Sequence, residues 1–179
     1  MKNKLVLMTV ISAFGFAGIA YATPPITSGG TLGVTADIAG SINLIFTTDA
    51  SGFAVTGTGT ATASLPLGTV QMYGGTVPTN VTRTPNTNVS FTLSTPVDVE
   101  VDLANTSSPN YSLLGNLNAA DLVNTWTFNA IAVSAAGITP QVTAGTYGTA
   151  TPYTLAVTIP ASNTSGTLSN TINFTASAN

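Results

Sequence analysis

Three carboxylates are the only clustered side chains in this sequence with the chemistry for acid–base catalysis or metal binding. Asp98, Glu100 and Asp102 alternate with four branched apolar residues: Val97, Val99, Val101 and Leu103. Strict alternation is typical of a β-strand, because successive side chains of a strand point to opposite faces of its sheet. We therefore expect the carboxylates to share one wet face, while the apolar side chains enter a core.

This arrangement suits neither calcium binding nor glycoside hydrolysis. Calcium prefers several carboxylate oxygens. Alternate strand residues lie roughly 6.6 Å apart, so three in line cannot surround one ion without loop ligands such as Asp49 or Asp121. A glycosidase needs two carboxylates that oppose each other in a cleft, whereas these lie on one flat face. We expect the acidic face to keep the strand soluble and to discourage pairing with stray strand edges.

The other side chains that usually carry catalysis are missing. The sequence has no His and no Cys, which removes the usual general base, thiolate nucleophiles, zinc and haem ligands, and disulfides. Ser and Thr are abundant, but they lack a His or Lys base to activate them. The sequence therefore predicts no catalytic residue, no metal site, no cofactor and no enzymatic activity.

Residues 1–22 have the pattern of a signal peptide. Lys2 and Lys4 form a basic tip, the 15 residues from Leu5 to Ile19 carry no charge, and Ala20-Tyr21-Ala22 is a small-x-small cleavage pattern. An amino-terminal membrane anchor is the alternative, but the apolar run is shorter than the roughly 20 residues that span a bilayer. We expect export to the cell surface or medium, through the periplasm in a Gram-negative cell.

Cleavage would leave 157 of the 179 residues with one cation, Arg83, against six carboxylates and a net charge of −5. Nucleic acids and anionic membranes are bound chiefly through Lys and Arg, so neither is an expected partner. No second apolar run of membrane length follows in the sequence.

The remaining pattern predicts an all-β, antiparallel, two-sheet immunoglobulin-like β-sandwich of about eight or nine strands in residues 41–179. Thr, Ser, Asn and Gly dominate the polar positions, and strand-like segments separated by turn residues recur at spacings of roughly 8 to 12 residues. We expect strands at 42–46, 53–55, 65–72, 89–93, 97–103, 126–133, 138–142, 153–159 and 168–176.

Four finer expectations accompany this pattern. Residues 94–96 turn the strand at 89–93 into the acidic strand, so that the two strands form a hairpin. Arg83 lies in a loop at 77–88. A helical turn forms near 118–123. Trp126 is the largest core residue, in a strand that changes its buried face at a bulge.

Residues 23–40 read as a flexible leader followed by a first strand. Alternate positions of this strand are apolar: Leu32, Val34, Ala36 and Ile38. A strand on such a tether can pair within its own sheet or in a neighbouring subunit, and both remain open. In donor-strand complementation, an added strand gains main-chain hydrogen bonds and fills pockets with its alternate side chains. These four residues are the candidate subunit-contact residues.

A signal peptide, a tethered alternating strand and a Thr/Ala/Gly-rich sandwich resemble exported fimbrial subunits, including chaperone-usher pilins and related filament proteins. Gly166, fourteen from the end, matches a glycine of the pilin pattern, whereas Ala178 stands where pilins have an aromatic residue, and the pilin disulfide is absent. Gly29-Gly30-Thr31 is similar to the start of camelysin-type fibre proteins. The resemblance implies a structural subunit that joins copies of itself or other exported subunits into a pilus or fibre.

A self-contained surface or extracellular domain, acting as an adhesin or carbohydrate-binding module, is the alternative function. Four tyrosines are available to stack on sugars: Tyr73, Tyr111, Tyr147 and Tyr153. Six Asn-x-Ser/Thr triplets also offer glycosylation acceptors, at Asn80, Asn88, Asn105, Asn110, Asn163 and Asn173. Glycans are therefore possible partners.

Overall fold

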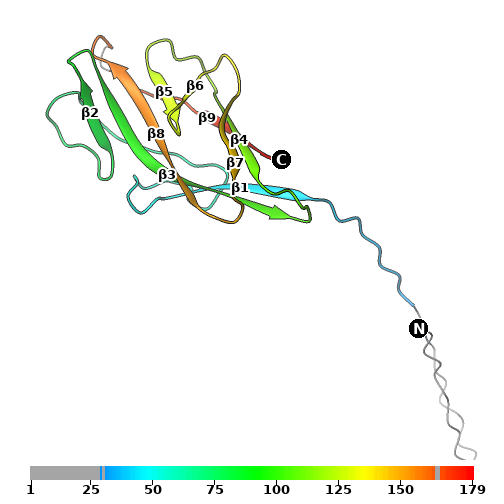
Figure 1. Ribbon diagram of the computed structural model, residues 1–179. Coiled ribbons are helices and arrows are strands. Elements are labelled where there is room, and N and C mark those ends of the chain that lie inside the picture. Colours follow the sequence, from blue (N-terminus) through cyan, green and yellow to red (C-terminus); the bar gives the residue numbers. More distant parts are fainter. Residues whose placement is uncertain (1–28, 30, 164–165) are drawn as a thin grey trace, which may run out of the picture. The chain divides into compact units, whose positions relative to one another are not determined.

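The computed structural model describes residue 29 and residues 31–163 and 166–179. The predicted signal peptide lies outside these residues. The chain divides into two units, residues 1–36 and 37–179, and the second contains nine strands (Figure 1). They are β1 (Ser41–Thr47), β2 (Thr82–Asn86), β3 (Ser90–Ala104), β4 (Tyr111–Leu117), β5 (Thr125–Phe128), β6 (Ile131–Val133), β7 (Thr139–Gly145), β8 (Thr151–Pro160) and β9 (Ile172–Ala178).

The strands form two antiparallel sheets. The larger has the order β1-β3-β8-β5-β6, with β2 also beside β3, and the smaller has the order β7-β4-β9. The prediction of an all-β sandwich with eight or nine strands is confirmed. The helical turn predicted near 118–123 is wrong, since the described residues contain no helix and this segment is a loop.

The acidic strand is the carboxyl half of β3, the longest strand of the larger sheet. Val99 and Val101 are fully buried, whereas Asp98, Glu100 and Asp102 lie half-buried on the opposite face. The predicted hairpin at 94–96 is wrong, because β3 runs without interruption for 15 residues. Alternation continues through the expected turn: Phe91, Leu93, Thr95 and Val97 are all buried on the same side as the valines.

Pro96 is accommodated because it falls between two partner strands. On one edge of β3, β2 pairs with Ser90–Ser94 and β1 pairs with Asp98–Ala104, whereas β8 runs along the other edge. The Pro96 carbonyl faces Gly52, where an added Cβ would lie 2.2 Å from that oxygen. Since the N–H and C=O of one strand residue point to the same side, the missing N–H falls in the gap and no ladder bond is lost.

Four other predictions differ from the structure. The segments 53–55 and 65–72 are loops, although Phe53, Leu67, Val70 and Met72 pack against the core beside β3. Arg83 lies on β2 rather than in a loop. The bulge predicted within 126–133 is a hairpin turn, because Asn129 and Ala130 have φ of 52° and 62°, the left-handed pair typical of a type I′ turn.

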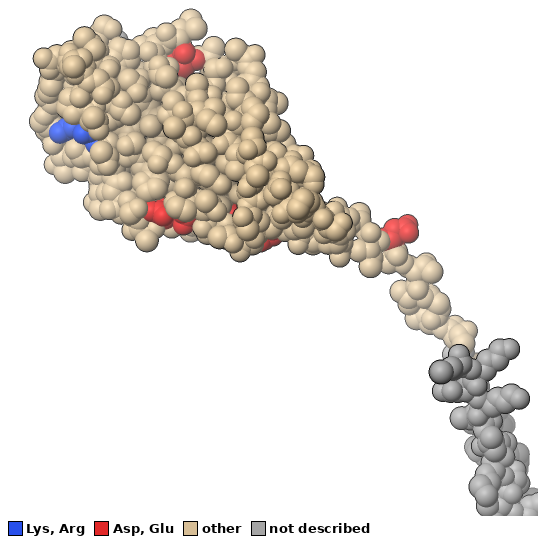
Figure 2. Space-filling model, viewed as in Figure 1, with Lys and Arg blue, Asp and Glu red and all other residues tan. Residues whose placement is uncertain are grey.

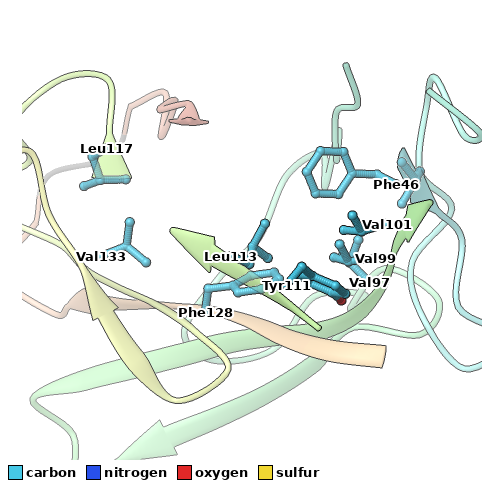
Figure 3. Close-up of a cluster of buried hydrophobic side chains, with 10 residues drawn as sticks. Phe46, Val97, Val99, Val101, Tyr111, Leu113, Leu117, Phe128 and Val133 are labelled. Carbon is cyan, nitrogen blue, oxygen red and sulfur yellow. The ribbon is translucent and has the colours of Figure 1, made fainter. Parts of the chain in front are cut away.

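The main core lies between the two sheets. Its buried side chains come from five strands and one loop and converge on the space that Figure 3 shows, with Tyr111 and Phe128 the largest that are fully buried. Phe128 packs edge-on to Phe174, with ring centroids 4.8 Å apart. Trp126 is only half-buried, so the prediction that it is the largest core residue is wrong. It packs against both the main core and a second buried cluster, which consists of Val81, Phe91, Leu93, Val157 and Ile159.

Candidate functional site: an exposed alternating segment and two open strand edges

The predicted subunit-contact residues are exposed in the single chain. Leu32, Val34 and Ile38 have 90%, 82% and 79% of their surface accessible, and Ala36 is exposed as well. Residues 31–40 lie outside any strand. A strand needs a neighbour for its backbone N–H and C=O groups, and these residues have none within the described chain. Their role as a donor strand stays a prediction.

One side of the sandwich is closed by hydrogen bonds between the two sheets. The backbone N–H of Leu117 at the end of β4 donates to the carbonyl of Ser134, which follows β6, at 3.1 Å. The Thr139 hydroxyl on β7 donates to the carbonyl of Ala132 on β6 at 3.2 Å. The side chains beneath these hydrogen bonds are closely packed, since Leu117 and Val133 are each only 3% exposed.

The opposite side of the sandwich is open, and we call it the β1–β9 margin. Here β1, an edge of the larger sheet, lies beside β9, an edge of the smaller sheet, and the rings of Phe46 and Phe174 are 5.4 Å apart. No backbone hydrogen bond joins these two strands in the part of the chain that the structure describes. The inward apolar side chains at the margin are only half-buried: Ile42, Leu44, Ile172, Phe174 and Ala176.

The two edges at this margin differ in how much backbone they leave unpaired. On β1, the N–H of Phe46 donates to Thr60 at 2.9 Å and its carbonyl accepts from Gly59 at 2.7 Å, so a loop covers the end of that edge. On β9, all seven residues pair with β4 on one side. Among the described residues, no strand or backbone hydrogen bond reaches the other edge of β9.

Asp121, one of the two loop carboxylates considered for calcium, is fully engaged in its own loop. Its oxygens accept from the N–H groups of Val123 and Asn124 at 3.1 and 2.9 Å and from the Trp126 indole at 2.7 Å. Although partial burial acts to raise the pKa of Asp121, these hydrogen bonds, with the Asn124 side chain, lower it to about 2. The carboxylate lines a hollow of about 420 Å³ beside Trp126 but has little free acceptor capacity.

Asp49, the other loop carboxylate, lies close to Asp98 on β3. Burial and then the negative charge of Asp49 raise the pKa of Asp98, and the Asp98 Oδ1 atom is buried without a hydrogen-bond partner. The hydroxyl and backbone N–H of Ser51 donate to Asp49 at 2.6 and 2.8 Å, which lowers the pKa of Asp49. Within the described chain, no three His, Cys, Asp or Glu residues gather in a way that could hold a metal ion.

The four tyrosines considered for sugar stacking do not share a surface. Tyr111 is fully buried, with its ring 5.5 Å from that of Tyr147. Tyr153 packs on Phe128 in the core. Tyr73 is 57% exposed, and its hydroxyl donates to the Asn88 side chain.

Sequence reasoning missed the open edges of β1 and β9. The apolar stripe of β9 is visible in the sequence, but no sequence signal marks a strand as an edge, because strand order is set by the whole fold.

Comparison with protein-family models, curated proteins and solved structures finds no match to this chain. Residues 29, 31–163 and 166–179 include no helix with the length and apolar character needed to cross a membrane.

Proposed function

We propose that this protein is an exported structural subunit that assembles into a pilus or extracellular fibre by strand addition, with residues 31–38 as the donor strand. One observation carries the proposal: an exposed segment with strand alternation occurs in the same chain as a sandwich whose β1–β9 margin leaves strand edges unpaired. Each half of a strand-addition joint is thus present in every copy.

The pattern of the segment supports its burial on one face. Leu32, Val34, Ala36 and Ile38 alternate with Gly33, Thr35, Asp37 and Ala39. Burying an exposed Leu, Val or Ile side chain contributes roughly 1.5–3 kcal/mol. Three such side chains, together with new main-chain hydrogen bonds, act against the entropy cost of ordering a short segment.

The surface of the sandwich also suits close association of copies. Few charged atoms lie on the face that Figure 2 shows. Arg83 is the only Lys or Arg among the described residues, and its guanidinium donates to the carbonyl of Gln71 at 2.9 Å and to that of Gly74. A surface with so few charges opposes the approach of like copies only weakly.

Electron microscopy and size-exclusion chromatography of the secreted protein test the proposal. We expect fibres or a ladder of oligomers from the unmodified chain, and monomers from a variant that lacks residues 31–38. Circular dichroism of the variant serves as the control for a retained β-sandwich. A secreted chain that stays monomeric at high concentration would sink the proposal and favour a self-contained surface domain.

A further inference from the structure

We propose that residues 32–38 bind the free edge of β9 in a second copy of the chain, antiparallel to β9 and in one defined register. This inference rests on the proposed function and names the acceptor strand. Three observations support it. They are the lengths of the two open edges, the parity of the donor segment (which of its two alternating sets of side chains faces the core in a given pairing), and the sizes of the side chains that would face each other.

The available edge length favours β9 over β1. The free edge of β9 extends over seven residues, Ile172–Ala178, and the donor stripe from Leu32 to Ile38 also spans seven. On β1, the loop bonds at Phe46 leave only Ser41–Ile45 open. A donor strand on β1 would therefore leave two of its residues without ladder partners.

Parity disfavours folding of the segment back onto β1 of its own chain. The tightest hairpin, with Ala39-Gly40 as a two-residue turn, would set Asp37, Thr35 and Gly33 opposite the inward residues Ile42, Leu44 and Phe46. Directly opposed residues share a face, so this hairpin buries the polar face of the segment and exposes the apolar one.

A three-residue turn restores the parity at a cost. With residues 38–40 as the turn, Ile38 leaves the strand and Leu32 comes opposite Phe46; with residues 39–41, Val34 comes opposite Phe46 and Leu32 lies beyond it. In both placements the pairing reaches Phe46, whose backbone N–H and C=O already bond Thr60 and Gly59. Pairing between copies needs no such turn, because the donor and acceptor strands then belong to different chains.

Side-chain size selects the register on β9. An antiparallel alignment over the full seven residues sets a small residue opposite a larger one at three of its four inward positions, as in a close-packed interface. Its inward pairs are Leu32 with Ala178, Val34 with Ala176, Ala36 with Phe174, and Ile38 with Ile172. The parallel alignment of the same length sets Ala36 opposite Ala176 and Val34 opposite Phe174, which leaves one position underfilled and crowds the other.

Disulfide trapping tests this register, and the chain has no cysteine of its own to interfere. Thr35 and Thr175 are both exposed, and the proposed register sets them directly opposite each other on the polar face. Directly opposed residues have Cβ atoms within reach of a disulfide, whereas diagonal neighbours do not. The Thr35→Cys variant, carrying a size tag, is mixed with untagged Thr175→Cys and oxidised.

We expect the mixed, tagged-to-untagged covalent dimer to form on the order of tenfold more from Thr35→Cys with Thr175→Cys than from Thr35→Cys with Asn43→Cys on β1 or with Ser177→Cys two residues off register. Preferential trapping with Asn43→Cys would overturn the assignment to β9 and leave strand addition standing. Preferential trapping with Ser177→Cys would overturn the register.

The double variant Thr35→Cys/Thr175→Cys separates pairing between copies from pairing within one chain. A ladder of covalent oligomers supports the inference, whereas a fast-migrating, internally linked monomer overturns it. Absence of oligomers from the unmodified protein is a different outcome, because it overturns the proposed function itself.

Discussion

Gly145 is a residue at which the core has no room for added volume. A Cβ at this position would lie 2.1 to 2.5 Å from three ring atoms of Tyr111, which is fully buried and cannot swing away. We expect Gly145→Ala to lower the free energy of unfolding by about 1–3 kcal/mol, the usual cost of overpacking. Urea unfolding measures the loss. Gly137→Ala is the matched control, since nothing lies within 4 Å of its added Cβ.

Asp121 makes stability depend on pH in the acid range. Its pKa is about 2 in the folded chain, below the ordinary 3.8, so its contribution is complete above pH 4 and disappears as the pH falls toward 2. We expect Asp121→Asn to cost about 1–2 kcal/mol at pH 7, after allowance for solvent screening, and almost nothing at pH 2. Thermal unfolding from pH 7 to pH 2 measures the gap, and an equal gap at both ends would contradict this account.

Trp126→Phe provides a check on the same loop. It removes the indole N–H that donates to Asp121 and keeps an aromatic ring in place. We expect the pH-dependent part of its stability loss to be smaller than that of Asp121→Asn, because the backbone donors of Val123 and Asn124 remain.

The contribution of Asp98 to stability depends on pH in the opposite direction to that of Asp121. Burial and the charge of Asp49 raise its pKa, so the fold favours the protonated form, and stability from this group is present at low pH and lost as the pH rises through the raised pKa. We expect Asp98→Asn to be more stable than the unmodified protein at pH 7 and equal to it near pH 3, by thermal unfolding. Asp49→Asn relieves the same repulsion but weakens the Ser51 contacts, so its gain should be smaller.

At the scale of elements, Thr95 ties β3 to the long loop between β1 and β2. This buried hydroxyl accepts from the N–H of Phe53 at 2.7 Å and donates to the carbonyl of Asn80 at 3.0 Å. Thr95→Val keeps the shape but leaves both groups unsatisfied, so we expect a loss of about 1–3 kcal/mol in urea unfolding. The same change at exposed Thr154 should cost almost nothing. Equal losses at both sites would contradict the view that the hydrogen bonds of Thr95 hold the loop on β3.

The sequence predicts strands well where one strand alone determines its own pattern. The acidic half of β3 and the stripe of β8 are both found where alternation places them. Pro96 misled the prediction because a proline is excluded only where a partner needs its N–H, and the gap between β1 and β2 depends on the strand order. Arg83 lies in a strand with almost no apolar residues, which forms by pairing with β3 rather than by patterning.

For the same reason, the sequence predicts the donor segment of the candidate site but not the strand edges that would accept it. The alternation of Leu32, Val34, Ala36 and Ile38 is a local property, and the exposure of these side chains agrees with a segment that lacks a partner. The β1–β9 margin is a property of strand order. Nothing in the stripe of Ile172, Phe174 and Ala176 distinguishes an edge strand from a central one.

At the scale of the whole molecule, the proposed assembly depends on which face of the donor segment carries a charge. Val34 and Thr35 are adjacent and both exposed in the single chain, so an Asp at either position should leave the monomer fold unchanged. In a joined strand, Val34 enters the acceptor core and Thr35 faces water. A carboxylate at position 34 would then be buried without a partner, which costs several kcal/mol.

We therefore expect Val34→Asp to abolish fibres and Thr35→Asp to preserve them. Size-exclusion chromatography and electron microscopy report assembly, while the thermal midpoint of the monomer controls for folding. The two variants have the same net charge, so repulsion between copies cannot explain a difference between them. Equal loss of assembly in both variants would mean that charge alone opposes association, and equal retention would mean that residues 31–38 are not the donor strand.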